Sequence, residues 1–208
     1  MCIRDSLQTA QIVALSTDAL AGLTTAQMAA LTATQTAVLT TDQVVALSTE
    51  QIAAMETADI RALTTRQAAV LTSEQAASLT TAQVAAMETA DLRAMSTLAL
   101  SNLSADQIVA LTSNQVANLT TLQIASLTSE QIAAIQTQDV AALTQAQAAA
   151  LTATQVPGLD TNQMRALTSA NIRALTTTTV AALSTEQLES ITTGQAQALT
   201  TAQLAALS

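Results

Sequence analysis

Several residue types are missing from this chain, and their absence narrows what it can do. Its 208 residues contain no His, Phe, Trp, Tyr or Lys, only one Cys and one Pro, and three Gly. Nucleophile–base catalysis would draw on His or Cys, and one Cys cannot form an intrachain disulfide or a Cys-rich zinc site. Three Gly cannot supply a phosphate-binding loop or a calcium-binding nonapeptide repeat. We therefore expect no enzyme activity, no catalytic residues, no cofactor and no metal site.

Positive charge and long apolar runs are also scarce. Six Arg stand against 15 acidic residues, for a net charge of −9, and they form no basic stripe, so no nucleic-acid partner is expected. No apolar run approaches the roughly 18–20 residues of a membrane-spanning helix, and we expect no membrane insertion in this segment. Half of the residues are nevertheless hydrophobic, which is too many for a disordered chain.

What the chain does contain is an eight-residue repeat. From Leu7 onward it divides without insertion or deletion into twenty-five octads. The first position is always Leu, Met or Ile; the second is Ser or Thr in twenty octads, and the fifth is Gln in eighteen. Such self-similarity predicts a repeat architecture. We interpret residues 1–6 as a leader that is not native, and 7–208 as a single octapeptide-repeat solenoid, a fragment of a longer array.

Each octad carries the signals of a helix start. Ser or Thr at the second position is a preferred N-cap, and sixteen octads read S/T-x-x-Q, the capping box. The aliphatic residues at positions one and six form a hydrophobic staple, and seven octads place Asp or Glu at position four, where the helix dipole favours negative charge. The sequence therefore predicts an all-α solenoid with one very short helix, over positions three to eight, in each repeat.

A continuous helix and a β-solenoid are the alternative architectures. A continuous helix is rejected because eight residues at about 100° each leave the Leu row about 80° out of phase per repeat. A β-solenoid with three octads per 24-residue coil remains the alternative, since Thr, Ile and Val favour strands. Abundant Ala and Gln, and the lack of strict alternation, count against it.

A few octads depart from the pattern. METADIRA (55–62) and METADLRA (87–94) have Glu at position two and Asp at position five, and Asp139 likewise follows Gln136. In one interpretation the cap moves to Thr57, Thr89 and Thr137, so that each Asp lies nearer the helix start. Pro157 lacks the N–H that a helix interior needs, and it predicts a shortened helix and a local bend.

The phrase LTTAQVAA (79–86) and the similar octad LSTEQLES (183–190) resemble octapeptide-repeat regions of large bacterial proteins described as surface, adhesion or haem-utilisation proteins. The resemblance covers residues 7–208. It implies a structural module, namely a stalk, spacer or adhesive segment of a larger surface or secreted protein. The haem description gains no support, since the chain lacks His and Tyr.

Two other functions stay open. The chain could be a binding module for a protein or glycan that uses the variable positions four and seven. A spacer should scatter its exposed apolar and charged residues, whereas a binder should gather them on one face. Even rows of Thr at positions two and three also resemble ice-binding surfaces, but hydroxyls used as caps would not be free for that role.

Overall fold

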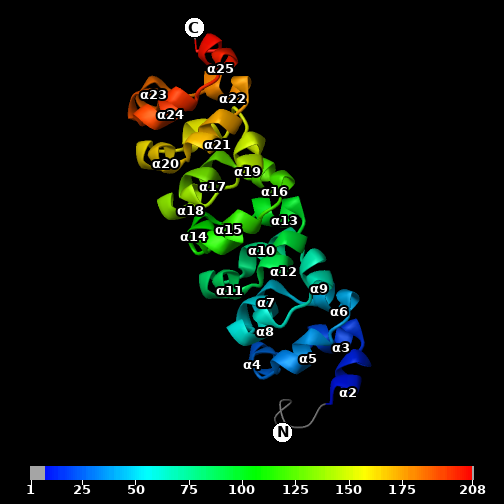
Figure 1. The fold of residues 1–208 in the computed structure, drawn as a ribbon. Coiled ribbons are helices and arrows are strands. Elements are labelled where there is room, and N and C mark those ends of the chain that lie inside the picture. Colours follow the sequence, from blue (N-terminus) through cyan, green and yellow to red (C-terminus); the bar gives the residue numbers. More distant parts are fainter. Residues whose placement is uncertain (1–7, 208) are drawn as a thin grey trace. The chain divides into compact units, whose positions relative to one another are not determined.

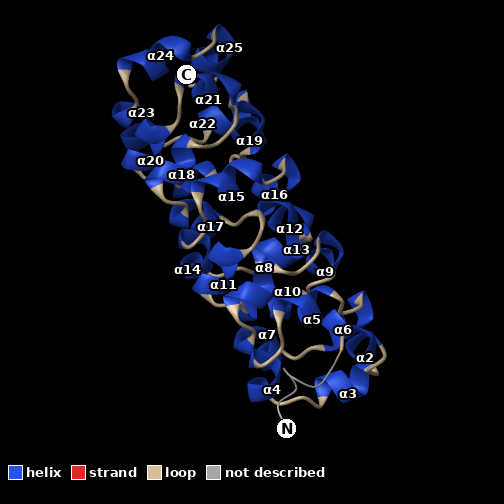
Figure 2. Cartoon of the chain, turned by 60° about the horizontal axis from the view of Figure 1, so that its bottom comes forward, coloured by secondary structure: helices blue, strands red, loops and turns tan. Residues whose placement is uncertain are grey.

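The computed structural model describes residues 8–207, and within them all regular secondary structure is helical. It contains 24 short α-helices and one 3-10 helix, with no strand among these described residues (Figure 2). The prediction of an all-α solenoid of very short helices is confirmed, and the β-solenoid alternative is wrong. Residues 1–6, interpreted above as a leader, lie outside the described part.

The chain forms two compact units, residues 1–110 (unit 1) and 111–208 (unit 2), and each is described by itself. The helices of unit 1 are α2 (Thr9–Val13), α3 (Thr17–Ala21), α4 (Thr25–Ala29), α5 (Ala33–Ala37), α6 (Thr41–Ala46), α7 (Thr49–Ala54), α8 (Thr57–Arg61), α9 (Thr65–Ala69), α10 (Ser73–Ser78), α11 (Thr81–Ala86), α12 (Thr89–Ala94), α13 (Thr97–Ser101) and α14 (Ala105–Val109). Those of unit 2 are α15 (Ser113–Asn118), α16 (Thr121–Ser126), α17 (Ser129–Ala134), α18 (Thr137–Ala141), α19 (Gln145–Ala150), the 3-10 helix η1 (Val156–Gly158), α20 (Thr161–Ala166), α21 (Ser169–Ala174), α22 (Thr177–Ala181), α23 (Thr185–Ser190), α24 (Thr193–Ala198) and α25 (Thr201–Ala205).

Helix starts follow the predicted chemistry. In α6, the Thr40 hydroxyl accepts the Gln43 N–H at 3.2 Å, and the Gln43 Oε1 accepts the Thr40 N–H at 2.8 Å. The staple residues Leu39 and Val44 are both buried. These contacts set where each helix begins. A helix of five or six residues is too short to be stable alone, so packing against other helices must supply most of its stability.

That packing comes from the helix three octads away. In unit 1, the first row is α2, α5, α8, α11 and α14, the second is α3, α6, α9 and α12, and the third is α4, α7, α10 and α13 (Figure 1). In unit 2, one row is α15, α18, α20 and α23, another is α16, α19, α21 and α24, and α17 packs on η1 and α22 on α25. Three octads, or 24 residues, therefore make one coil with a helix on each of three sides.

The core differs from the prediction in one respect. Between residues 31 and 180, positions one and six are buried, as the aliphatic pattern indicates, but so is position five: Gln83, for example, is only 1% exposed. Glutamine is rarely buried unless its polar atoms find partners. The fifth position therefore belongs to the interior, and its hydrogen bonds explain how the coils are joined.

The irregular octads keep the common register. α8, α12 and α18 begin at Thr57, Thr89 and Thr137, with Glu56, Glu88 and Gln136 as N-caps. The interpretation that moved the caps to the threonines is wrong. Each of these helices begins at position three of its octad, as the others do, because packing against the adjoining coils holds it there whatever residue stands at the N-cap. At Pro157 the prediction of a shortened helix is confirmed, because a turn and the three-residue η1 replace the α-helix.

Candidate functional site: the buried fifth position and two surface hollows

Each buried glutamine connects two helix ends at once. In α19, the Gln147 Oε1 accepts the Thr144 N–H at 2.8 Å, which satisfies a free donor at the helix start. Its Nε2 donates to the carbonyl oxygens of Val116 and Leu119, both at 2.8 Å, 31 and 28 residues earlier. These carbonyls lie at the C-terminal end of α15, where the regular helical hydrogen bonds run out; the Val116 carbonyl also accepts the Leu119 N–H at 3.2 Å. One side chain thus joins the start of a helix to the end of a helix in the preceding coil.

The same arrangement recurs along both units. The Nε2 of each of these glutamines donates to carbonyls 31 and 28 residues earlier, and the described cases within one unit are Gln43, Gln51, Gln67, Gln75, Gln83 and Gln107 in unit 1 and Gln147, Gln155, Gln163, Gln187, Gln195 and Gln203 in unit 2. A buried hydrogen-bond network of this kind contributes specificity because a misaligned coil would leave its members unpaired. We call it the amide row.

The sequence held a signal for this second role. A capping box accepts Glu as readily as Gln at its last position, yet no octad has Glu there. Only Gln has both an acceptor for the cap and a donor for another chain segment. The capping box explains why the side chain at position five needs an oxygen that accepts. The exclusion of Glu indicates that the side chain must also donate to an acceptor elsewhere in the chain, and local sequence rules do not identify that acceptor.

Shorter polar residues at the fifth position keep half of the connection. The Asn171 Nδ2 donates to the Leu143 carbonyl at 2.8 Å, and the Thr179 Oγ1 donates to the Leu151 carbonyl at 2.9 Å. In both, the acceptor lies 28 residues earlier, as in the amide row. That carbonyl is therefore a general acceptor, and a donor placed opposite it from position five will use it.

Three aspartates occupy the same buried position but carry no amide. Asp59, Asp91 and Asp139 are 2%, 3% and 1% exposed, although the pattern of acids at position four would suggest solvated carboxylates. The Asp59 Oδ2 accepts the Glu56 N–H at 3.1 Å. Asp139 accepts a hydrogen bond from the Ser113 hydroxyl through Oδ1, while its buried Oδ2 has no partner within the described residues.

Burial changes the acidity of two of these groups. It raises the pKa of Asp91 to about 6, with a smaller contribution from the negative charge of Glu88. It also raises the pKa of Asp59, against the lowering effect of the Glu56 N–H hydrogen bond and with a further rise from the Glu56 charge. A carboxyl removed from water favours its neutral form. The exposed acids at position four behave in the opposite way: hydrogen bonds at the helix start lower the pKa of Glu50, Glu74 and Glu130.

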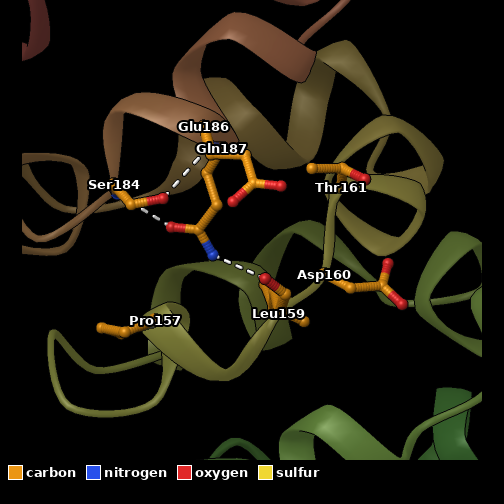
Figure 3. A pocket seen from close by; sticks show the side chains of 7 residues that line it. All are labelled: Pro157, Leu159, Asp160, Thr161, Ser184, Glu186 and Gln187. Carbon is orange, nitrogen blue, oxygen red and sulfur yellow. Dashed lines mark hydrogen bonds between the residues drawn. The ribbon is translucent and has the colours of Figure 1, made fainter.

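Two surface hollows occur at equivalent places in the octad. The larger, about 240 Å³, lies beside the Pro157 turn and is lined by Pro157, Leu159, Asp160, Thr161, Ser184, Glu186 and Gln187 (Figure 3). The smaller, about 180 Å³, is lined by Ala29, Leu31, Thr32, Ala33, Glu56, Ala58 and Asp59. Two acidic residues line each hollow, Asp160 and Glu186 in the larger and Glu56 and Asp59 in the smaller.

Three of the polar side chains around the larger hollow, those of Asp160, Ser184 and Gln187, form hydrogen bonds at helix ends. In Figure 3, the Ser184 hydroxyl accepts the Gln187 N–H, and the Gln187 Nε2 donates to the Leu159 carbonyl at 2.6 Å. Asp160 caps α20 by accepting the Gln163 N–H at 2.7 Å. Within residues 8–207, no group of three or more acidic or Cys side chains is placed to hold a metal ion. The second-position hydroxyls act as caps, as predicted.

The exposed surface consists mainly of positions two, three, four and seven. In unit 1, the large exposed apolar side chains are Val13, Val45, Leu98 and Val109, and they belong to α2, α6, α13 and α14. These helices belong to all three rows and to different coils. None of the helices in the described part of the chain has the length and apolar character needed to cross a bilayer.

Comparison with known proteins agrees with the repeat. A family model described as the ALTTAQ repeat matches residues 5–33, 52–87, 84–121, 156–193 and 166–201, which together make up more than half of the chain. No curated protein matches it. The tandem repeat inferred from the octads is thereby confirmed, while the link to surface or haem-utilisation proteins stays a prediction.

Proposed function

This chain belongs to the ALTTAQ repeat family, and from that membership and the geometry of the amide row we propose that it is a structural module without enzymatic activity. It would serve as a stalk, spacer or adhesive segment in a larger bacterial surface or secreted protein. The observation that carries the proposal is that its buried polar groups join one coil to the next. The Gln147 amide, for example, holds Val116 and Leu119 of the preceding coil.

The surface supports a spacer over a binding module. A binding site draws on clustered anchors, with aromatic residues and Arg enriched. Here aromatic residues are absent from the sequence. Arg61, Arg66 and Arg93 lie on three helices of two rows, and the exposed valines and Leu98 are spread over all three rows. Scattering is the behaviour expected of a spacer, so the protein- or glycan-binding alternative has less support.

The proposal is tested by changing the number of coils. Deleting residues 127–150 removes three whole octads, and we expect a chain with the same helical content per residue. Its largest dimension in small-angle X-ray scattering should fall by the roughly 8–10 Å that separates packed helices. A matched deletion of residues 127–146 breaks the octad register and should lose helicity. An unchanged dimension after the 24-residue deletion would contradict the spacer role.

A further inference from the structure

The two METAD octads, 55–62 and 87–94, set an acid group where the amide row needs a donor. Counting back 28 and 31 residues from Asp91, as the glutamines do, gives the carbonyls of Leu63 and Ile60. An ionised carboxylate can only accept hydrogen bonds, whereas a protonated one also donates. The Asp91 carboxyl is 3% exposed and has no hydrogen-bond partner within residues 8–207. A buried polar group in this state is costly.

Asp59 presents the same problem with a hollow beside it. The carbonyls 28 and 31 residues earlier belong to Leu31 and Met28, and Leu31 lines the 180 Å³ hollow together with Asp59. Aspartate is shorter than glutamine by one methylene. The Asp59 carboxyl keeps the cap bond from the Glu56 N–H, but it has no amide to offer the preceding coil.

The charges that face these groups are few. Asp59 lies on α8, which packs against α5 and α11, and neither of those helices contains a charged residue; α8 itself carries Glu56 and Arg61. Asp91 lies on α12 with Glu88 and Arg93, and α9, packed against it, contributes the exposed Arg66. At each site a second carboxylate lies at the N-cap, three residues earlier, and it opposes ionisation of the buried aspartate.

We propose that Asp59 and Asp91 make two contacts between coils of unit 1 stronger at acidic pH, namely α8 with α5 and α12 with α9. We call these contacts acid-strengthened joints. When protonated, each aspartate donates to the carbonyl 28 residues earlier, as Asn171 and Thr179 do in unit 2. When ionised, it faces carbonyl oxygens without a donor, and the coil opens more readily. The joint is thus closed at mildly acidic pH and weakened at neutral pH, while the intervening Gln coils are indifferent to pH. This inference does not depend on the spacer role.

The sign and size of the pH effect follow from the linkage between protonation and folding. A pKa of about 6 in the folded state, against an ordinary value of 3.8, means that folding favours the protonated Asp91. The stabilisation is complete below the unfolded pKa and is lost as pH rises through about 6. Since one pKa unit is a factor of ten in the equilibrium constant, the opening equilibrium around α12 should rise by up to about a hundredfold from acidic to neutral pH.

Hydrogen exchange on the full-length chain tests this directly. The Leu92 amide, which donates to the Glu88 carbonyl at 3.0 Å, reports on α12, and the Val44 amide of α6 is the internal reference beside Gln43. After correction for intrinsic exchange, the protection of Leu92 should fall by about tenfold between about pH 5 and pH 8, while that of Val44 stays level. In Asp91→Asn, Leu92 protection should become independent of pH and at least equal the acidic value of the unaltered chain, because the amide can donate to Leu63.

Asp59→Asn, read at the Ile60 amide, repeats the comparison at the second joint and guards against a local folding defect in the first variant. The proposal is overturned by Leu92 protection that is level with pH in the unaltered chain. It is equally overturned by a pH dependence that survives in Asp91→Asn, or by an equal fall at Val44, which would indicate a general effect of charge and not a joint.

Discussion

Replacing Gln147 by Met isolates the contribution of the amide row. Methionine is unbranched and close in size to glutamine, so it fills the same space but makes none of the hydrogen bonds. Three backbone groups each lose a hydrogen bond that is 2.8 Å long in the intact chain: the Thr144 N–H and the carbonyls of Val116 and Leu119. Gln147 is only 2% exposed, so water cannot readily replace the amide at these groups.

The magnitude follows from the number of bonds. A hydrogen bond contributes about 0.5–1.5 kcal/mol net, and leaving a buried partner unsatisfied costs about 1–3 kcal/mol. Three bonds give an expected loss of about 3–5 kcal/mol in the free energy of unfolding, a large share of the roughly 5–15 kcal/mol typical of a domain. Gln145→Met, two residues away on the exposed side of α19, is the matched control and should change stability by less than about 0.5 kcal/mol.

Urea unfolding followed by far-UV circular dichroism measures both variants, because the chain has no aromatic residue to report by fluorescence. Exchange of the Ala148 amide, which donates to the Thr144 carbonyl at 2.9 Å, localises the effect to α19. If Gln147→Met costs no more than Gln145→Met, the coils are held by apolar packing alone, and the reasoning about the amide row fails.

Three further substitutions test other features. Gly158→Ala should lower the free energy of unfolding by about 1–3 kcal/mol, because an added Cβ would lie 2.6 Å from the Ser129 carbonyl oxygen; Gly194→Ala, whose nearest atom would be the Ser169 Oγ at 3.5 Å, should not destabilise, and equal losses in urea unfolding would contradict this. Thr36→Val should stabilise by about 1–2 kcal/mol, because the buried Thr36 hydroxyl has no partner within residues 8–207; a loss relative to exposed Thr34→Val would refute the assignment. Glu130→Gln should destabilise the fold at neutral pH. The hydrogen bond from its own N–H, and then that from the Thr128 hydroxyl, lower the pKa of Glu130. The ionised Glu130 therefore stabilises the fold above the unfolded pKa, and this stabilisation is lost as pH falls through the folded pKa. Thermal melts at several pH values should therefore show a difference that disappears in acid, opposite in sign to the behaviour of Asp91.

Local chemistry was enough to predict the helix starts. Thr40 and Gln43 form the cap and Leu39 and Val44 the staple, and all four groups lie within six residues of one another. Interactions over such short separations do not depend on the rest of the fold. The same holds at Pro157, where the missing N–H ends the α-helix regardless of its neighbours.

The coil period could not be read in this way. Every octad has the same sequence pattern, so no local feature shows whether its helix packs against the helix three octads away or against one two or four octads away. The choice rests on packing between helices such as α9 and α12. The burial of the three aspartates could not be predicted for a related reason: nothing in the octad of Asp91 shows that position five faces the adjoining coil.

The spacing of the amide row also bears on how such a gene can change in length. Replication slippage that gains or loses one octad would leave every glutamine with a carbonyl 28 residues behind it, so the protein would still fold. Every helix that follows the change, however, would move to the next of the three rows. The twin octads METADIRA and METADLRA illustrate this: they lie four octads apart, and their helices α8 and α12 stand in different rows. Copying therefore scatters related side chains around the coil, and a uniform face survives only when octads are added or lost in threes.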